Sequence, residues 1–125
     1  MRQRLIACAL KRVAEVPGIQ ACALVDGASS LVWETSGGAD GMARAWEAAV
    51  DYWRLYLRLQ PQFGVLGEMR VAMMHHVDGV LGVLPCRGES KLVVVCLAAH
   101  HGVDWTACQR RVRQLAKHVD AALAN

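Results

Sequence analysis

Proline, charge and long apolar runs are all scarce in this sequence. Only 3 of its 125 residues are proline and 20% are charged, whereas 54% are hydrophobic. This composition excludes intrinsic disorder, collagen-like repeats and low-complexity linkers. The longest uncharged apolar run, residues 92–99, is far shorter than the ~20 residues that a membrane-spanning helix needs. We therefore expect one folded domain over residues 1–125, without membrane insertion.

The motifs of nucleotide binding and of hydrolysis are also missing. Residues 36–41 are rich in glycine, but they lack the Lys-Ser/Thr pair of a phosphate-binding loop and the spacing of a dinucleotide fingerprint. The sequence has no Gly-x-Ser-x-Gly elbow, and no set of Cys, His and acidic residues has a diagnostic spacing. We therefore expect no enzymatic activity and no cofactor.

Five cysteines form an odd set without a Cys-x-x-Cys pair. Cys8, Cys22, Cys96 and Cys108 lie in apolar segments, which is typical of reduced, buried thiols in a cytoplasmic protein. Cys86 lies in an expected turn beside Arg87, a cation that could lower the pKa of its thiol. Two interpretations of Cys86 remain open, an exposed thiol without a role and the nucleophile of a small thiol enzyme.

Two histidine pairs end two of the expected strands. His75-His76 and His100-His101 should reach the same edge of the sheet, because their strands run in the same direction. One strand lies between them, which separates their backbones by ~9–10 Å. Zinc–nitrogen bonds are only ~2.0–2.1 Å long. We therefore expect solvated histidines and no metal site.

Helices and strands follow one another in a clear order. Apolar residues at helical spacing predict helices over residues 2–16, 41–60 and 104–124, with Asp40 and Asp104 as N-caps of the second and third. Pro17-Gly18 and Pro61 end the first and second helices. Strands are predicted over residues 19–25, 31–35, 65–74, 79–84 and 91–98, because turn signals separate these runs.

The strands indicate how the layers are arranged. Residues 21–25 and 92–97 are apolar at consecutive positions, so both faces of the sheet must be covered. Short connections make the strands antiparallel. The fold class predicted is therefore α/β (α+β), with three layers, helix, sheet and helix, around a five-stranded antiparallel sheet.

The middle helix carries more apolar surface than one sheet can cover. Its polar residues form a narrow stripe, and the remaining arc is far wider than the ~100° of a helix that lies on one sheet. A buried Trp or Tyr removes ~150–250 Å² from water, so leaving such rings exposed is costly. A second copy of the chain is the simplest cover. The alternative is that residues 61–67 fold back over part of this surface.

Residues 16–27, Val-Pro-Gly-Ile-Gln-Ala-Cys-Ala-Leu-Val-Asp-Gly, followed by a long helix, a three-stranded meander and a closing helix, resemble the roadblock family of the dynein light-chain type. The resemblance spans essentially the whole chain. It implies a roadblock/profilin-like sheet with the first and last helices on one face and the second helix on the other. It also implies a dimer, homotypic or with a related chain, built by the second helix and the third strand. The interface residues expected here are Ala45, Trp46, Ala49, Tyr52, Trp53, Tyr56, Leu57, Met69 and Val71.

The same resemblance implies a function. Roadblock proteins act as non-catalytic scaffolds or regulators of small GTPases or as adaptors on motor complexes, and bacterial members often accompany a GTPase that controls polarity or motility. We therefore expect a cytoplasmic, bacterial, homodimeric scaffold for a small GTPase or another signalling partner. The alternative is a dimeric ligand-sensing or interaction module of the same fold without a GTPase.

Basic residues gather on the first and last helices, at Arg2, Arg4, Lys11, Arg12, Arg110, Arg111, Arg113 and Lys117. If these helices lie side by side, they form a basic surface. This surface could be a solvated face, a site for an acidic protein or a site for nucleic acid. Nucleic acid is the least favoured, because no aromatic residues for base stacking interleave the charges.

Overall fold

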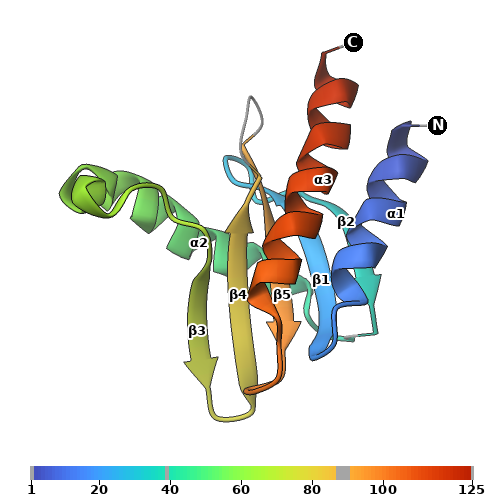
Figure 1. Ribbon diagram of the computed structural model, residues 1–125, viewed down its shortest axis with the longest axis horizontal. Coiled ribbons are helices and arrows are strands. Elements are labelled where there is room, and N and C mark those ends of the chain that lie inside the picture. The colour runs from blue at the N-terminus through green and yellow to red at the C-terminus, as the bar shows by residue number, and fades with distance from the viewer. Residues whose placement is uncertain (1, 39, 87–90, 125) are drawn as a thin grey trace.

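The computed structural model describes residues 2–38, 40–86 and 91–124 (Figure 1). Its elements, in chain order, are α1 (Arg2–Ala14), β1 (Ile19–Asp26), β2 (Val32–Gly37), α2 (Ala43–Leu59), the 3₁₀ helix η1 (Gln60–Leu66), β3 (Ala72–His76), β4 (Gly79–Pro85), β5 (Leu92–Ala98) and α3 (Trp105–Leu123). The predicted order of helices and strands is confirmed. No helix among the described residues is long and apolar enough to cross a membrane.

The five strands form one antiparallel sheet in the order β2-β1-β5-β4-β3. β5 lies at the centre, with Cys96 opposite Cys22 of β1 on one side and opposite Gly82 of β4 on the other. Nearly every residue of β5 is buried, which confirms that both faces of the sheet are covered. β2 and β3 are the edge strands.

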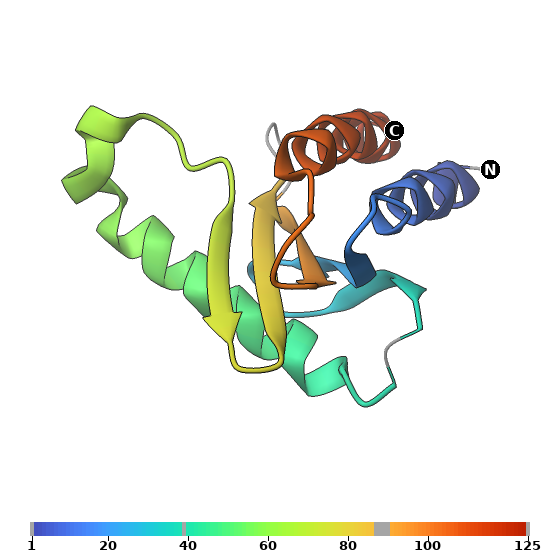
Figure 2. The same cartoon turned by 60° about the horizontal axis from the view of Figure 1, so that its bottom comes forward.

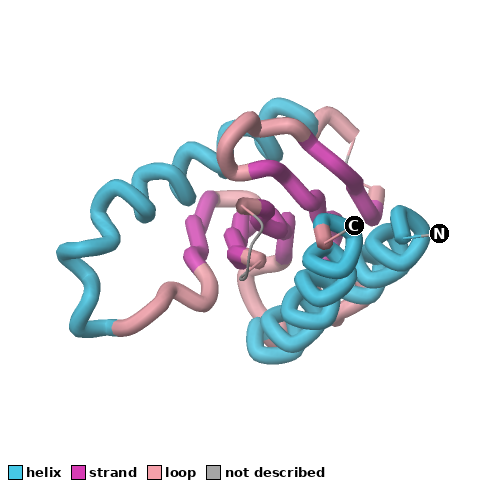
Figure 3. The backbone as a smooth tube through the Cα atoms, turned by 90° about the horizontal axis from the view of Figure 1, so that it is seen from above, coloured by secondary structure: helices cyan, strands magenta, loops and turns pink. Residues whose placement is uncertain are grey.

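Helices cover both faces of the sheet, in the predicted three layers (Figure 3). α1 and α3 lie side by side on one face, and α2 crosses the other. Each face has its own core. The core under α1 and α3 includes Leu10, Leu24 and Leu115, and the core under α2 includes Trp46, Val50 and Val95.

Of the two N-caps predicted from the sequence, Asp104 and Asp40, one is confirmed and one is wrong. The Asp104 carboxylate accepts a hydrogen bond of 3.0 Å from the Ala107 amide, so the predicted N-cap of α3 is confirmed. The predicted N-cap of α2 is wrong. Met42 occupies that position without a side-chain hydrogen bond, because Gly41 turns the chain at a positive φ of 79° between Asp40 and the helix.

The third strand is shorter than predicted and lies later in the chain. The sequence predicts a strand over residues 65–74, but β3 begins only at Ala72. Val65 and Leu66 belong to η1 instead, and Gly67 ends that helix with a positive φ of 77°. Because residues 60–71 do not join the sheet, they extend beyond its β3 edge (Figure 2).

Candidate protein-interaction surface

Only the first half of α2 packs closely on the sheet. Trp46, Ala49 and Val50 are its buried residues, and the helix contacts β1, β4 and β5. Its second half continues past the β3 edge, and η1 turns back beyond it (Figure 2). We call residues 52–66 the α2 overhang. The apolar residues of this helix therefore serve two purposes. Those of its first half pack on the sheet, and many of those in its second half project beyond it.

Large apolar side chains are concentrated on the overhang. Val65 is 96% exposed and Leu66 is 80% exposed, values that are unusual for such side chains in a folded protein. The other exposed ones in the overhang are Tyr52, Leu55, Leu57, Leu59 and Phe63, and Met73 of the neighbouring strand β3 is 45% exposed. β3 is also an edge strand, so one row of its backbone groups has no partner strand.

A stack of three aromatic rings stiffens the overhang. The ring centroids of Trp53 and Tyr56 lie 5.5 Å apart, and those of Tyr56 and Phe63 lie 6.3 Å apart with nearly parallel planes. The Met69 amide donates a hydrogen bond of 3.2 Å to the Tyr56 hydroxyl. The alternative cover that the sequence left open, a fold-back of residues 61–67, is thus present in part. It leaves Val65 and Leu66 in solvent.

The residues that the sequence assigned to an interface lie in different environments. Trp46 and Ala49 are buried in the core of their own chain, and Val71 packs against the core on the α1 and α3 side. Tyr52 and Leu57 are exposed on the overhang. Ala45, Trp53, Tyr56 and Met69 are half-buried. Phe63 lies outside the expected interface. Val65 and Leu66 belong to residues 65–74, the predicted strand that the resemblance places in the dimer, but they lie in η1 instead.

Arg54 fixes the overhang to the sheet, a role that the sequence did not reveal. Its Nε donates to the Gly27 carbonyl at 2.9 Å, and one terminal nitrogen donates to the Ala28 carbonyl at 3.1 Å and to the Ser30 hydroxyl at 2.6 Å. The other terminal nitrogen contacts Asp51 at 2.7 Å. One guanidinium thus joins α2 to the β1–β2 turn. In the sequence, Arg54 is only one member of a polar stripe.

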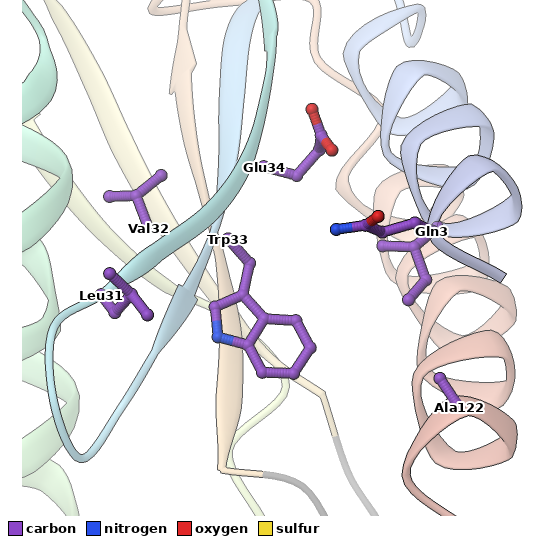
Figure 4. A pocket seen from close by; sticks show the side chains of 7 residues that line it. Gln3, Leu31, Val32, Trp33, Glu34 and Ala122 are labelled. Atoms are coloured by element: carbon purple, nitrogen blue, oxygen red, sulfur yellow. The ribbon is translucent and has the colours of Figure 1, made fainter. Parts of the chain in front are cut away.

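A recess lies between the edge strand β2 and the ends of α1 and α3 (Figure 4). Its volume is about 800 Å³. The register of β2 shifts here, since Glu34 pairs with Leu24 and Val32 pairs with Val25. This bulge lets Trp33 and Glu34 both line the recess, where Glu34 points toward Gln3 of α1 (Figure 4). Ile6, Leu31, Val32 and Ala122 complete the lining.

The cysteine predictions fail in two places. Cys22, Cys96 and Cys108 are buried as predicted, but Cys8 is exposed and Cys86 is buried. Burial, together with a smaller effect of the nearby Asp120 carboxylate, raises the pKa of the Cys86 thiol to about 12. Arg87, the cation invoked to activate Cys86, lies outside the described residues. A thiol with such a pKa stays protonated at neutral pH, which contradicts the hypothesis of a thiol enzyme at Cys86.

Both histidine pairs reach the same edge of the sheet, as predicted, and all four side chains are exposed. His100 donates a hydrogen bond of 2.7 Å from Nε2 to the His76 carbonyl, so one ring bridges the two strand ends. Within the described residues, no group of three or more His, Cys, Asp or Glu side chains could hold a metal ion. His100 therefore links the end of β5 to the end of β3.

Comparison with known proteins identifies solved structures of similar fold. No protein-family model matches the sequence, and no curated protein matches it. Among solved structures, a roadblock/LC7 domain from Streptomyces avermitilis is 20% identical, with 97% of each chain covered and a TM-score of 0.74. A structure of MglB with a tetrameric arrangement is 15% identical, with 97% of this chain and 92% of that chain covered and a TM-score of 0.76.

A third structure is the gliding protein MglB from Thermus thermophilus. It is 15% identical, 96% of this chain and 90% of that chain are covered, and the TM-score is 0.68. At sequence identities of 15–20%, the similarity to these structures establishes the fold. The chain therefore has the roadblock-type fold that its sequence resembles, from its first helix to its last.

Proposed function

We propose that this chain is a non-catalytic, homodimeric, cytoplasmic scaffold that binds and regulates a small GTPase or another signalling or motor partner. The observation that carries the proposal is the α2 overhang beside the free edge of β3. Seven large apolar side chains of the overhang are at least 39% exposed, and a second copy of the chain would remove them from water.

A symmetric pair would use the overhang and the β3 edge together. Two α2 helices packed against each other would bury Leu57 and Val65, and two β3 strands could pair through their free backbone groups. The ring stack of Trp53, Tyr56 and Phe63 supports this arrangement, since a preformed surface loses less entropy on binding. The tetrameric arrangement of MglB is an example of self-assembly with this fold.

A GTPase would bind the platform that the paired helices form. The sequence has no phosphate-binding loop of its own, so any effect on GTP hydrolysis would arise by ordering the catalytic groups of the partner. The roadblock-type fold supports this role, because the resemblance seen in the sequence implies scaffolds and regulators of small GTPases.

The dimer is tested by light scattering on the purified chain. The wild type should have twice the chain mass of 13.6 kDa. Leu57→Glu should shift the mass toward that of one chain, because it places a charge on the overhang. Leu123→Glu is the matched control, since Leu123 is 51% exposed on α3 while Leu57 is 44% exposed on α2. A wild type that stays at one chain mass at high concentration would refute the dimer.

Binding of a GTPase is tested with purified small GTPases from the organism that encodes this chain, each loaded with GDP or a non-hydrolysable GTP analogue. We expect one of them to bind the wild type in a nucleotide-dependent manner, and to bind Leu57→Glu at least about tenfold more weakly if the platform needs both copies. Single-turnover GTP hydrolysis then measures regulation. If the dimer forms but no GTPase binds, the GTPase part of the proposal fails while the dimer stands.

The recess at Trp33 favours a second candidate, a dimeric ligand-sensing module of the same fold. Its volume of about 800 Å³ is large enough for a small molecule. Trp33 is 40% exposed there and could stack on an apolar ligand. A small-molecule screen by thermal shift tests this candidate. A hit that raises the melting temperature of the wild type but not of Trp33→Ala would support it.

A further inference from the structure

The charges of this chain are segregated between two parts of the fold. α1 and α3 together carry eight basic residues and one acidic residue, a net charge of +7 with neutral histidines. The rest of the chain carries six basic and ten acidic residues, a net charge of −4. A net charge of only +3 for the whole chain therefore conceals a strongly basic pair of helices.

These two helices lie side by side on the face of the sheet opposite α2 (Figure 3). Six of their basic side chains are exposed, those of Arg4, Lys11, Arg12, Arg110, Arg113 and Lys117. The one ion pair among the described residues joins Arg54 and Asp51 of α2. The described basic side chains of α1 and α3 thus have no carboxylate of a described residue within 4 Å to neutralise them, which leaves a positive potential over this face.

A groove runs between the two helices within this basic face. Leu5, Cys8 and Ala9 supply apolar surface from α1, while Arg12, Arg111, Gln114 and His118 supply the polar surface. Its volume is about 210 Å³, enough for a few side chains. A guanidinium nitrogen of Arg111 donates a hydrogen bond to the Arg12 carbonyl, which holds the two helices in register.

Leu5 is 44% exposed in this groove, so part of the apolar floor is open to water. The single carboxylate of α3, Asp120, lines a different recess on the β4 side of that helix, together with Arg113 and Lys117, so the cations of the groove itself are Arg12 and Arg111. No acidic residue is among the described residues that line the groove. The groove therefore combines an apolar floor with an uncompensated positive rim.

We propose that the α1/α3 groove binds an acidic, amphipathic segment of a protein partner. Carboxylates of the segment would pair with the cations of the rim, and an apolar side chain would fill the groove beside Leu5. The concave floor favours a protein segment over a lipid surface, because a layer of head groups cannot fill a narrow recess. The described groove residues include no Trp, Tyr or Phe ring on which a nucleic-acid base could stack. This surface is on the opposite face from the α2 overhang, so it does not depend on the proposed dimer.

The probe for this proposal is a synthetic helical peptide with glutamates on one face and leucines on the other. A second peptide has the same composition in scrambled order. Fluorescence anisotropy with the full chain should detect binding of the first peptide, and added salt should weaken it. The scrambled peptide should bind about tenfold more weakly, since it cannot present charge and apolar surface together. Two further probes test the competing interpretations. One is a vesicle that contains phosphatidylserine, and the other is a DNA duplex.

Two variants locate the binding site. Arg12→Glu should weaken binding of the amphipathic peptide about tenfold, because it replaces an attractive charge with a repulsive one. Leu5→Gln should cause a smaller loss by making the floor polar. Arg44→Glu on α2 is the matched control, an exposed arginine on the opposite face whose reversal changes the net charge equally. Its affinity for the peptide should stay within about twofold of the wild type.

The proposal is overturned if the scrambled peptide binds equally well, if only vesicles or DNA bind, or if Arg44→Glu weakens binding as much as Arg12→Glu. Circular dichroism establishes that each variant is folded. If Arg12→Glu does not fold, the Leu5→Gln variant and the two peptides still decide the matter, because Leu5 is partly exposed to solvent and tolerates a polar replacement.

Discussion

At the scale of single residues, Arg54 makes the most concentrated set of polar contacts. Three of its donors reach the β1–β2 turn, at Gly27, Ala28 and Ser30, and Asp51 neutralises part of its charge. The planar guanidinium can point several donors at one turn, which a lysine cannot do. Next to it, Gly27 leaves room for Trp53, because a Cβ on Gly27 would lie 3.0 Å from the indole ring.

Removing the Arg54 side chain should loosen α2 from the sheet. We expect Arg54→Ala to lower the free energy of unfolding by about 1–2 kcal/mol, a value reduced by the partial exposure of the side chain. Chemical denaturation measures this change, and hydrogen exchange at residues 27–31 should accelerate. Arg58→Ala, an exposed arginine of the same helix, should change stability by less than ~0.5 kcal/mol. Equal effects of the two variants would contradict the role of Arg54.

The thiols give a second prediction at this scale. In the native protein, a disulfide reagent should react rapidly with Cys8 alone, because it is the exposed cysteine of the five, and all five should react in denaturant. Cys86 should stay protected even at pH 9, since burial raises its pKa to about 12. Mass spectrometry of the labelled protein identifies the sites. Fast labelling of native Cys86 would show that the thiol is accessible.

Cysteine burial also shows why sequence reasoning failed at single residues. Cys8 lies at helical spacing from apolar neighbours, but it faces the outer groove between α1 and α3. Cys86 follows β4 in an expected turn, yet the core under α1 and α3 includes it. Sequence periodicity identifies an apolar face only to within a residue, and it does not show which turn residues the core will bury.

At the scale of elements, the contact between α3 and β4 depends on a glycine. A Cβ on Gly82 would lie 2.7 Å from the indole carbons of Trp105, which is the first residue of α3. This close approach places the first turn of α3 directly on the sheet. Strand glycines often mark such contacts.

Filling this contact should displace Trp105. We expect Gly82→Ala to lower the free energy of unfolding by about 1–3 kcal/mol, as is typical of overpacking in a core. Gly38→Ala is the control, since nothing lies within 4 Å of a Cβ at that position. Trp105→Leu should restore part of the stability of Gly82→Ala, because it removes the ring that the methyl group meets. If the double variant is no more stable than Gly82→Ala, the cause is not this contact.

The sequence predicted the elements well where local signals and sheet pairing agreed. It failed at β3, because the apolar residues between Val65 and Val71 indicate a strand without showing whether a partner strand is available. Continuing the register of Ala72 with Val83 would place Arg70 opposite Pro85, which has no backbone N–H to donate. Tertiary pairing thus delays the start of the strand to Ala72, a point that the local pattern does not mark. The overhang follows from that late start, which places Val65 and Leu66 in η1 and not in the interface strand that the resemblance implied.

At the scale of the whole molecule, the two faces of the sheet carry different kinds of uncovered surface. The α2 side presents apolar side chains beyond the β3 edge, and the α1 and α3 side presents cations around a narrow groove. Apolar surface gives affinity in proportion to the area buried, whereas charge mainly gives selectivity and speed of association. A protein with both can bind its own copy on one face and still offer the other face to a different partner.

The proposed dimer makes thermal stability depend on protein concentration. If folded chains associate and unfolded chains do not, the melting temperature must rise as the protein is concentrated. Calorimetry over a wide range of concentrations should show this rise for the wild type and for Leu123→Glu. Leu57→Glu should melt at a temperature that does not depend on concentration, because its charge would be buried against the apolar overhang of the second chain. A concentration-independent wild type would mean that the exposed side chains of the overhang stay in water, and that another protein must be sought to cover them.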